Sequence, residues 1–213
     1  MTQHRIDPDA LIFDMDGTLW DAVDSYCKIW DTTFNECEIP HDPVTRADLM
    51  AQMGRPLEDI IVALAPNIPD LEIFLARLDH NEKAMMPVLG GRFYPEVRET
   101  IEALAPGRKL FMVSNCGTFG LDNMMHLAGI TPYITEALTH GGTGRTKAEN
   151  NAYIVDRYGL RSPYYVGDTQ GDATAARDAG CGMIWAAYGF GHVDEPNYTI
   201  NCFKDLTSLI VLH

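Results

Sequence analysis

The chain has 213 residues, and 46% of them are hydrophobic, which is enough to build the core of one large domain or of one domain with a modest insertion. Its 30 acidic and 16 basic residues give a net charge of −14 at pH 7. This charge disfavours nucleic acids and anionic membrane surfaces as partners, because phosphate groups attract lysine and arginine. Solubility alone would also explain the charge, but an anionic substrate would still need positive charge placed locally at its site.

The cysteines and the N-terminal residues indicate the compartment. The five cysteines are odd in number and form no C-x-x-C pair. Residues 1–9 are polar and too few for a signal peptide, and no apolar run approaches the length of a membrane span. We therefore expect a soluble, reduced, cytoplasmic protein without a membrane partner, and no pattern in the sequence predicts an oligomeric state.

The first predicted element is a strand at residues 10–14, whose apolar run suits burial on both faces of a parallel sheet. After it, only helical patterns follow from about residue 21 to residue 86, with Val23, Trp30 and Phe34 at helical spacing. The return segment is rich in glycine and proline and is typical of a hinge. We expect a helical insertion at residues 21–87 and a core formed by residues 1–20 and 88–213.

Strand and helix patterns alternate through the rest of the chain. Short apolar runs, typical of buried parallel strands, occupy residues 109–114, 164–167 and 182–187. Helical patterns, one beginning at a proline and three ending at a glycine, occupy residues 95–105, 118–129, 146–159 and 171–180. This alternation predicts an α/β fold, with a Rossmann-like core built on a parallel sheet.

Polar side chains follow three of these strands, at the edge where ligands bind in open α/β sheets. Asp14 and Asp16 end the first strand and point to the same side if the pleat continues through Met15. The later segments deliver Ser114, Asn115, Lys147, Asp168 and Asp172. Carboxylates gathered in one pocket repel each other unless a cation neutralises them, and a set of oxygen ligands favours Mg²⁺.

In chain order these residues resemble the four motifs of the haloacid dehalogenase (HAD) superfamily. The matching elements are DMDGT at residues 14–18, Ser114 at a strand end, Lys147, and GDTQGD at residues 167–172. The helical insertion resembles the superfamily's C1-type cap, and the likeness covers essentially the whole chain. The pattern is most similar to the C1-capped phosphatase branch and to phosphoglycolate phosphatase.

The resemblance implies a catalytic role for each core residue. Asp14 would be the nucleophile that forms an aspartyl phosphate. Asp16 would protonate the leaving oxygen and then act as the base that activates water. Ser114 would donate a hydrogen bond to a phosphoryl oxygen, and Lys147 would balance the charge on the nucleophile and the transferring group.

The resemblance also implies a cofactor, Mg²⁺, and a small phosphorylated metabolite as the partner. The metal would bind the carboxylates of Asp14 and Asp168 and the backbone carbonyl of Asp16. Asp172 would bind it through water or would support the ligands. Backbone N–H groups at Gly17 and beyond, with Thr18, would cradle the phosphoryl oxygens.

Two further residues are candidates for substrate binding, each with a structural alternative. Arg55 in the insertion could bind an anionic group of the substrate, or it could be an exposed residue at a helix start. Asn115 could contact the phosphate, or it could cap the following helix.

The implied activity is the Mg²⁺-dependent hydrolysis of a small phosphomonoester, with phosphoglycolate as the nearest substrate. A sugar phosphomutase and a catalytically silent HAD-fold binding protein are the alternatives. Dehalogenases of the superfamily lack the second aspartate, and such phosphomutases tend to carry a cap histidine soon after the first motif, where residues 20–26 contain none. Intact Asp14, Asp16, Lys147 and Asp168 argue against a silent protein.

The sequence departs from the phosphatase pattern at two places. Ala148 follows Lys147 where a proline is usual, which leaves the charge of the lysine in place. Pro95 and Glu96 stand where relatives often carry Pro-Gly, and we interpret them as a helix start.

Overall fold

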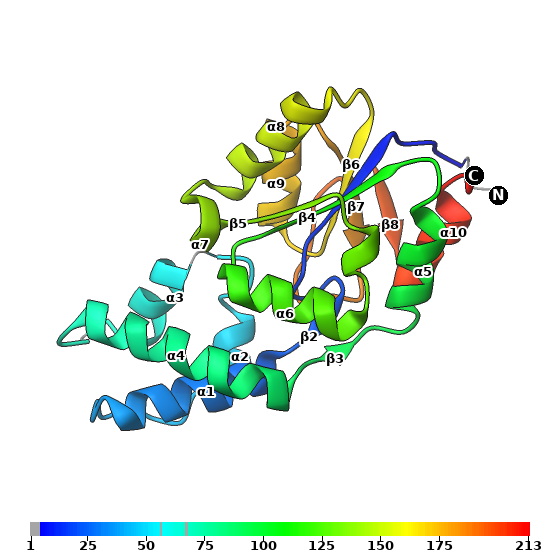
Figure 1. Ribbon diagram of the computed structural model, residues 1–213. Helices are drawn as coiled ribbons and strands as arrows, with labels where there is room; N and C mark the ends of the chain where they lie inside the picture. Colours follow the sequence, from blue (N-terminus) through cyan, green and yellow to red (C-terminus); the bar gives the residue numbers. More distant parts are fainter. Residues whose placement is uncertain (1–4, 56, 67) are drawn as a thin grey trace.

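A six-stranded, fully parallel sheet forms the centre of the molecule in the computed structural model, which describes residues 5–55, 57–66 and 68–213 (Figure 1). Its spatial order is β5-β4-β1-β6-β7-β8. The strands are β1 (Ala10–Phe13), β4 (Lys109–Ser114), β5 (Glu136–Thr139), β6 (Pro163–Gly167), β7 (Gly182–Ala186) and β8 (Tyr198–Ile200). The predicted α/β fold and all four predicted strands are confirmed.

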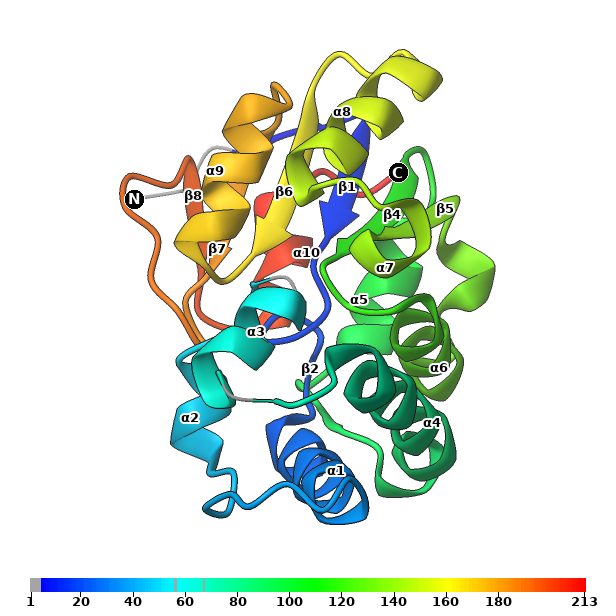
Figure 2. The ribbon, with the colours of Figure 1, turned by 90° about the vertical axis from the view of Figure 1, so that its left-hand side faces the viewer.

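Helices cover both faces of the sheet, as the alternation along β1 requires (Figure 2). Leu11 and Phe13 pack in one apolar cluster, whereas Ala10 and Ile12 pack in the other. The first cluster includes residues of α5 (Val97–Leu104), α6 (Thr118–Ala128) and α10 (Leu206–Leu209). The second includes residues of α8 (Lys147–Tyr158) and α9 (Gln170–Asp178). Because the strand is buried on both faces, it reads as a continuous apolar run.

The predicted helical insertion is present below the sheet in Figure 2. It consists of α1 (Val23–Glu36), α2 (Arg46–Met50), α3 (Leu57–Leu64) and α4 (Leu71–Leu89). Trp30 and Phe34 of α1 pack against Phe74 of α4, with ring centroids 4.9–6.0 Å apart. We call this insertion the cap. Its boundaries at residues 21 and 87 stay a prediction, and α4 itself ends at Leu89.

Two short antiparallel strands join the cap to the core. They are β2 (Trp20–Asp21) and β3 (Arg92–Phe93). The sequence predicts neither of them, because two-residue strands carry no periodicity, and it does not predict β5 or β8. β5 contains Glu136 and is only half-buried, so it lacks the continuous apolar run of a central strand. No helix in the described ranges has the length and apolar composition to cross a membrane.

Glu96 adopts an unusual conformation at the start of α5. The helix begins at Val97, and Glu96 precedes it with φ 59° and ψ 25°, in the left-handed region. A side chain with a Cβ is strained there, whereas glycine is not. Its carboxylate forms an exposed ion pair with Lys204 at 2.8 Å, which contributes little stability. Pro95 and Glu96 thus stand at a helix start, as predicted, with Glu96 as the N-cap residue and Val97 as the first helical residue.

We expect Glu96→Gly to raise the free energy of unfolding by up to about 1 kcal/mol, because it removes the left-handed strain. Glu96→Ala keeps the strain and loses the Lys204 ion pair, so it should be no more stable than the wild type. Urea denaturation of the three proteins checks this. A Glu96→Gly protein less stable than Glu96→Ala would contradict the strain argument.

Candidate active site

The sheet brings the predicted catalytic segments together at the carboxyl ends of three neighbouring strands. β1 pairs with β4 on one side and with β6 on the other. Asp14 follows β1, Ser114 ends β4, and Asp168 follows β6. All three side chains are buried. The Asp14 amide also donates to the Val166 carbonyl at 2.9 Å, which continues the sheet pattern into the site.

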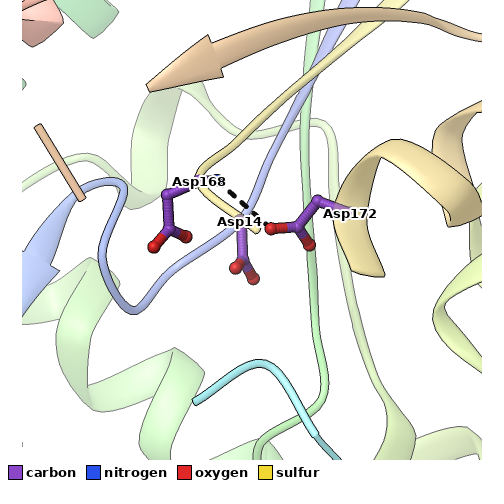
Figure 3. Close-up of side chains that lie close together, drawn as sticks. All are labelled: Asp14, Asp168 and Asp172. Atoms are coloured by element: carbon purple, nitrogen blue, oxygen red, sulfur yellow. Dashed lines mark hydrogen bonds between the residues drawn. The ribbon is translucent and has the colours of Figure 1, made fainter. Parts of the chain in front are cut away.

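Three carboxylates lie side by side at this edge (Figure 3). Asp14, Asp168 and Asp172 each offer an oxygen, and these oxygens lie within 4.8 Å of one another. Asp172 is in the first turn of α9, where Thr169 and Asp172 form a capping box. The arrangement concentrates negative charge in a buried place, which is stable only with compensating positive charge.

Lys147 supplies positive charge from the first turn of α8. Its Nζ lies 3.0 Å from Asp14 Oδ1 and 2.6 Å from Asp172 Oδ1, and the side chain is buried. A capping box between Thr146 and Glu149 begins the helix at this residue. Burial alone would lower the pKa of Lys147, but the carboxylates of Asp14 and Asp172 raise it well above its usual value. The lysine is therefore a fixed cation.

Asp172 is largely occupied by contacts within the protein. Its Oδ2 accepts hydrogen bonds from the Asp168 amide at 3.2 Å, the Thr169 amide at 3.0 Å and the Thr169 hydroxyl at 2.8 Å. Its Oδ1 accepts from Lys147. These bonds orient the loop that carries Asp168 and favour a supporting or water-mediated role for Asp172, which stays a prediction.

Asp168 is held by residues from two other segments. Its Oδ2 accepts from the Phe190 amide at 2.8 Å, and its Oδ1 accepts from the Thr18 hydroxyl at 3.4 Å. Gly17 has φ 78°, and a Cβ there would lie 2.2 Å from Asp168 Oδ2, so this close approach requires glycine. Burial, with Asp172 and Asp14 adding like charge, raises the pKa of Asp168 to about 8. This carboxylate needs a further cation to remain ionised at neutral pH.

Asp14 and Asp16 have different surroundings although they are two residues apart. Burial raises the pKa of Asp14 to about 6, and the attraction of Lys147 opposes the rise. Asp16 has no such lysine contact; its Oδ1 accepts from Trp20 Nε1 at 3.0 Å. Burial, then repulsion from Asp14, raises the pKa of Asp16 well above its usual value. Asp14 is therefore the better anion and Asp16 the better proton carrier.

The donors expected at Gly17 and Thr18 have partners within the protein. The Gly17 amide donates to the Trp20 carbonyl at 2.9 Å, and the Thr18 amide donates to the Met15 carbonyl at 3.3 Å. The Thr18 hydroxyl is bonded to Asp168. Their contacts favour a role in shaping the loop and holding Asp168, and direct substrate binding by them stays a prediction.

A cavity of about 100 Å³ lies between the sheet edge and the cap. Asp14, Asp16, Ser114 and Lys147 line it from the core. Its cap side is formed mainly by apolar side chains, namely Tyr26, Ile29, Trp30, Leu49, Met53, Leu57, Ile60 and Leu78. All four predicted catalytic residues therefore line one cavity, which the cap also lines.

Arg55 and Asn115 line the same cavity and contact the protein as well. Arg55 is about half exposed, donates to Gln52 and lies 3.9 Å from Asp59. Asn115 does not cap α6, which begins after Gly117 without a side-chain cap. Instead, its Nδ2 donates to the Gly54 carbonyl of the cap at 2.7 Å, so this residue ties the cap to the core.

Three groups of the site have no role predicted from the sequence. Trp20 fixes Asp16, the Phe190 amide fixes Asp168, and Glu82 of α4 reaches the cavity from the cap. None of them belongs to a motif with fixed spacing. For Phe190, the glycine-rich turn at residues 188–191, which follows a strand, was the available signal.

Solved structures share this fold. A protein described as a predicted phosphoglycolate phosphatase from Haemophilus somnus matches with a TM-score of 0.83, 22% identity, and coverage of 95% of this chain and 98% of that one. A predicted phosphatase from Clostridium acetobutylicum matches with a TM-score of 0.79 and 20% identity, covering 94% of this chain and 97% of that one.

Sequence comparisons identify the family. The phosphoglycolate phosphatase of Aliivibrio fischeri is 27% identical over 222 residues, covering 94% of this chain and 95% of the relative. The phosphoglycolate phosphatase of Pasteurella multocida is 24% identical over 232 residues, covering 99% of this chain and 100% of the relative. The sequence pattern of haloacid dehalogenase-like hydrolases matches residues 11–186, which include the first strand, the cap and every predicted catalytic residue. The chain belongs to the haloacid dehalogenase-like hydrolase family.

Proposed function

We propose that the protein is a Mg²⁺-dependent phosphatase that hydrolyses a small phosphomonoester through an aspartyl phosphate on Asp14. One observation carries the proposal: Asp14 and Asp16 line the same cavity, and their surroundings favour an anion at the first and a proton at the second. That difference suits a nucleophile and a general acid. The name shared by the relatives makes 2-phosphoglycolate the first substrate to test.

In the first half-reaction, the Asp14 carboxylate attacks phosphorus and the alcohol oxygen leaves. The Lys147 ammonium, 3.0 Å from Asp14, offsets the negative charge that the phosphoryl group brings to the nucleophile. The Ser114 hydroxyl donates to a phosphoryl oxygen. Asp16 gives its proton to the leaving oxygen, so an alkoxide does not have to form.

In the second half-reaction, water attacks the aspartyl phosphate. Asp16, deprotonated by the first step, accepts a proton from this water and returns to its original state. The hydrogen bond from Trp20 Nε1 holds its carboxyl group in place through both steps. Phosphate leaves and the Asp14 carboxylate is restored.

The oxygen-rich edge of the sheet suits a hard divalent cation. Asp14 and Asp168 are the carboxylate ligands we propose, with the backbone carbonyl of Asp16, while Asp172 holds Lys147 and the Asp168 loop. The charge of the cluster supports the binding of a cation. Among its described residues, three buried carboxylates face one lysine, so negative charge is left uncompensated. When bound, Mg²⁺ would screen the phosphoryl charge from the nucleophile.

Hydrolysis is a better interpretation than the two alternatives. The described residues that line the cavity include no histidine that could serve a mutase as a cap acid or base. The four core residues are intact and line one cavity, which a silent binding protein does not require. The cap, tied to the core through Asn115 and Gly54, would limit access to small substrates.

Asp14→Asn should abolish phosphate release from p-nitrophenyl phosphate in Mg²⁺, because the amide cannot act as the nucleophile. Asp122→Asn, an exposed change on α6, is the matched control and should retain wild-type turnover. Circular dichroism would establish that both variants fold. Near-native turnover by Asp14→Asn would rule out the proposed nucleophile.

Asp16→Asn should damage turnover in proportion to the basicity of the leaving group. An alkyl phosphate needs a proton on the departing oxygen, so its kcat should fall about a hundredfold or more. In single-turnover assays, release of p-nitrophenol should fall much less, because p-nitrophenolate leaves without a proton. Equal losses for both substrates would argue against general-acid catalysis by Asp16.

Mg²⁺ should stabilise the protein more as the pH rises. Burial raises the pKa of Asp14 to about 6 and that of Asp168 to about 8 without metal. A carboxyl group with a raised folded pKa contributes stability below its unfolded pKa and loses it as the pH rises through the folded value. The metal-free protein should therefore weaken from about pH 4 to about pH 8, and the cation should offset that loss.

The measurement is the melting temperature in EDTA and in saturating Mg²⁺, at about pH 5 and about pH 8. Asp168→Asn serves as the comparison and should lose most of the Mg²⁺ shift at the higher pH. A shift in the wild type that is equal at both pH values, or larger at the lower one, would contradict the proposed site.

A further inference from the structure

Glu82 is a carboxylate of the cap that faces the catalytic residues across the cavity. It lies on α4, four residues after Leu78, so the two side chains share one helix face, and both line the cavity with Asp14 and Asp16. Among the residues that the structure describes, none donates a hydrogen bond to Glu82 or forms an ion pair with it. The adjacent Lys83 is engaged with Asp79 at 2.7 Å.

Helix packing fixes the direction in which Glu82 points. The neighbouring Asn81 is buried, and its Nδ2 donates to Thr33 Oγ1 at 3.1 Å and to Glu36 Oε2 at 2.9 Å. These bonds to α1 set the rotation of α4 about its axis. The end of the Glu82 side chain lies against α6: a Cβ added to Gly120 of that helix would lie 2.7 Å from Glu82 Oε1. The carboxylate is therefore held between two helices.

The charge in the cavity is unevenly distributed. Two cations line it among the described residues, and both have carboxylate partners: Lys147 binds Asp14 and Asp172, and Arg55 faces Asp59. The cap side is otherwise apolar. Burial, then repulsion from Asp79, raises the pKa of Glu82 to about 7 against the opposing attraction of Lys83, so this carboxylate still lacks a cation in contact with it among the described residues. A ligand can supply that cation.

We propose that Glu82 selects the leaving group of the substrate by binding a protonated amine on it, so that the preferred substrates are small aminoalkyl phosphates. This inference rests on the proposed phosphatase activity. The phosphoryl group binds at Asp14, Ser114 and Lys147, and the leaving group extends toward the cap. An ammonium there donates a charge-assisted hydrogen bond to Glu82, whereas a carboxylate meets Glu82 as a like charge.

The test compares three esters of similar size with different charge: 2-aminoethyl phosphate, 2-hydroxyethyl phosphate and 2-phosphoglycolate. We expect kcat/KM of the wild type to fall in that order, by about tenfold or more from first to last. Glu82→Gln should remove about tenfold or more of this preference, measured within the variant as the ratio of kcat/KM for 2-aminoethyl phosphate to kcat/KM for 2-phosphoglycolate. Glu72→Gln, at an exposed position on the same helix, is the control and should behave as wild type.

Gly120→Ala is a second probe, because the added methyl group can be accommodated by displacing the end of the Glu82 side chain. It should reduce the same preference without changing residue 82. A wild type that favours 2-phosphoglycolate, or a preference for the amine that survives Glu82→Gln, overturns this inference and leaves the phosphatase proposal standing. No turnover of any ester, p-nitrophenyl phosphate included, overturns both.

Discussion

The ammonium of Lys147, 3.0 Å from Asp14 Oδ1 and 2.6 Å from Asp172 Oδ1, is the contact on which the candidate site depends. Three carboxylates are buried at one sheet edge, and removing their only described cation would leave uncompensated charge in a poorly solvated place. The fold supplies the cation through a helix start: the capping box of α8 begins the helix at Lys147 itself. The parallel sheet supplies the rest, because its strands all end at the same edge.

The link between Asp16 and Trp20 connects catalysis to the cap. Trp20 belongs to β2, which leads into α1, and it packs against Phe93 of β3, which leads back to the core. A Cβ on Gly91 would lie 2.5 Å from the Trp20 ring, so the return segment fits closely around this side chain. Any movement of the cap about these two strands therefore bears on the hydrogen bond that orients the proposed general acid.

The core of the site could be predicted from the sequence because each catalytic residue stands next to a short sequence signal for a strand end or a helix start. Asp14, Ser114 and Asp168 follow apolar strands, Lys147 follows a helix-start signal, and parallel strands bring their ends together without further information. The partners of these residues could not be predicted in this way. Glu82 reaches the cavity only because α4 packs on α1 in a particular rotation, and a single glutamate in a helical pattern carries no sign of that.

The cap and the core thus contribute different chemistry to one cavity. The core end holds the carboxylates and the lysine that act on the phosphoryl group, and this set does not depend on which alcohol leaves. The cap end has apolar walls and one unmatched carboxylate. The hydrogen bond from Asn115 to the Gly54 carbonyl holds the cap against the core beside this cavity. Beside apolar walls, even a single charge discriminates between substrates of opposite charge, so specificity at the cap can change by substitution of one residue while the phosphoryl chemistry stays the same.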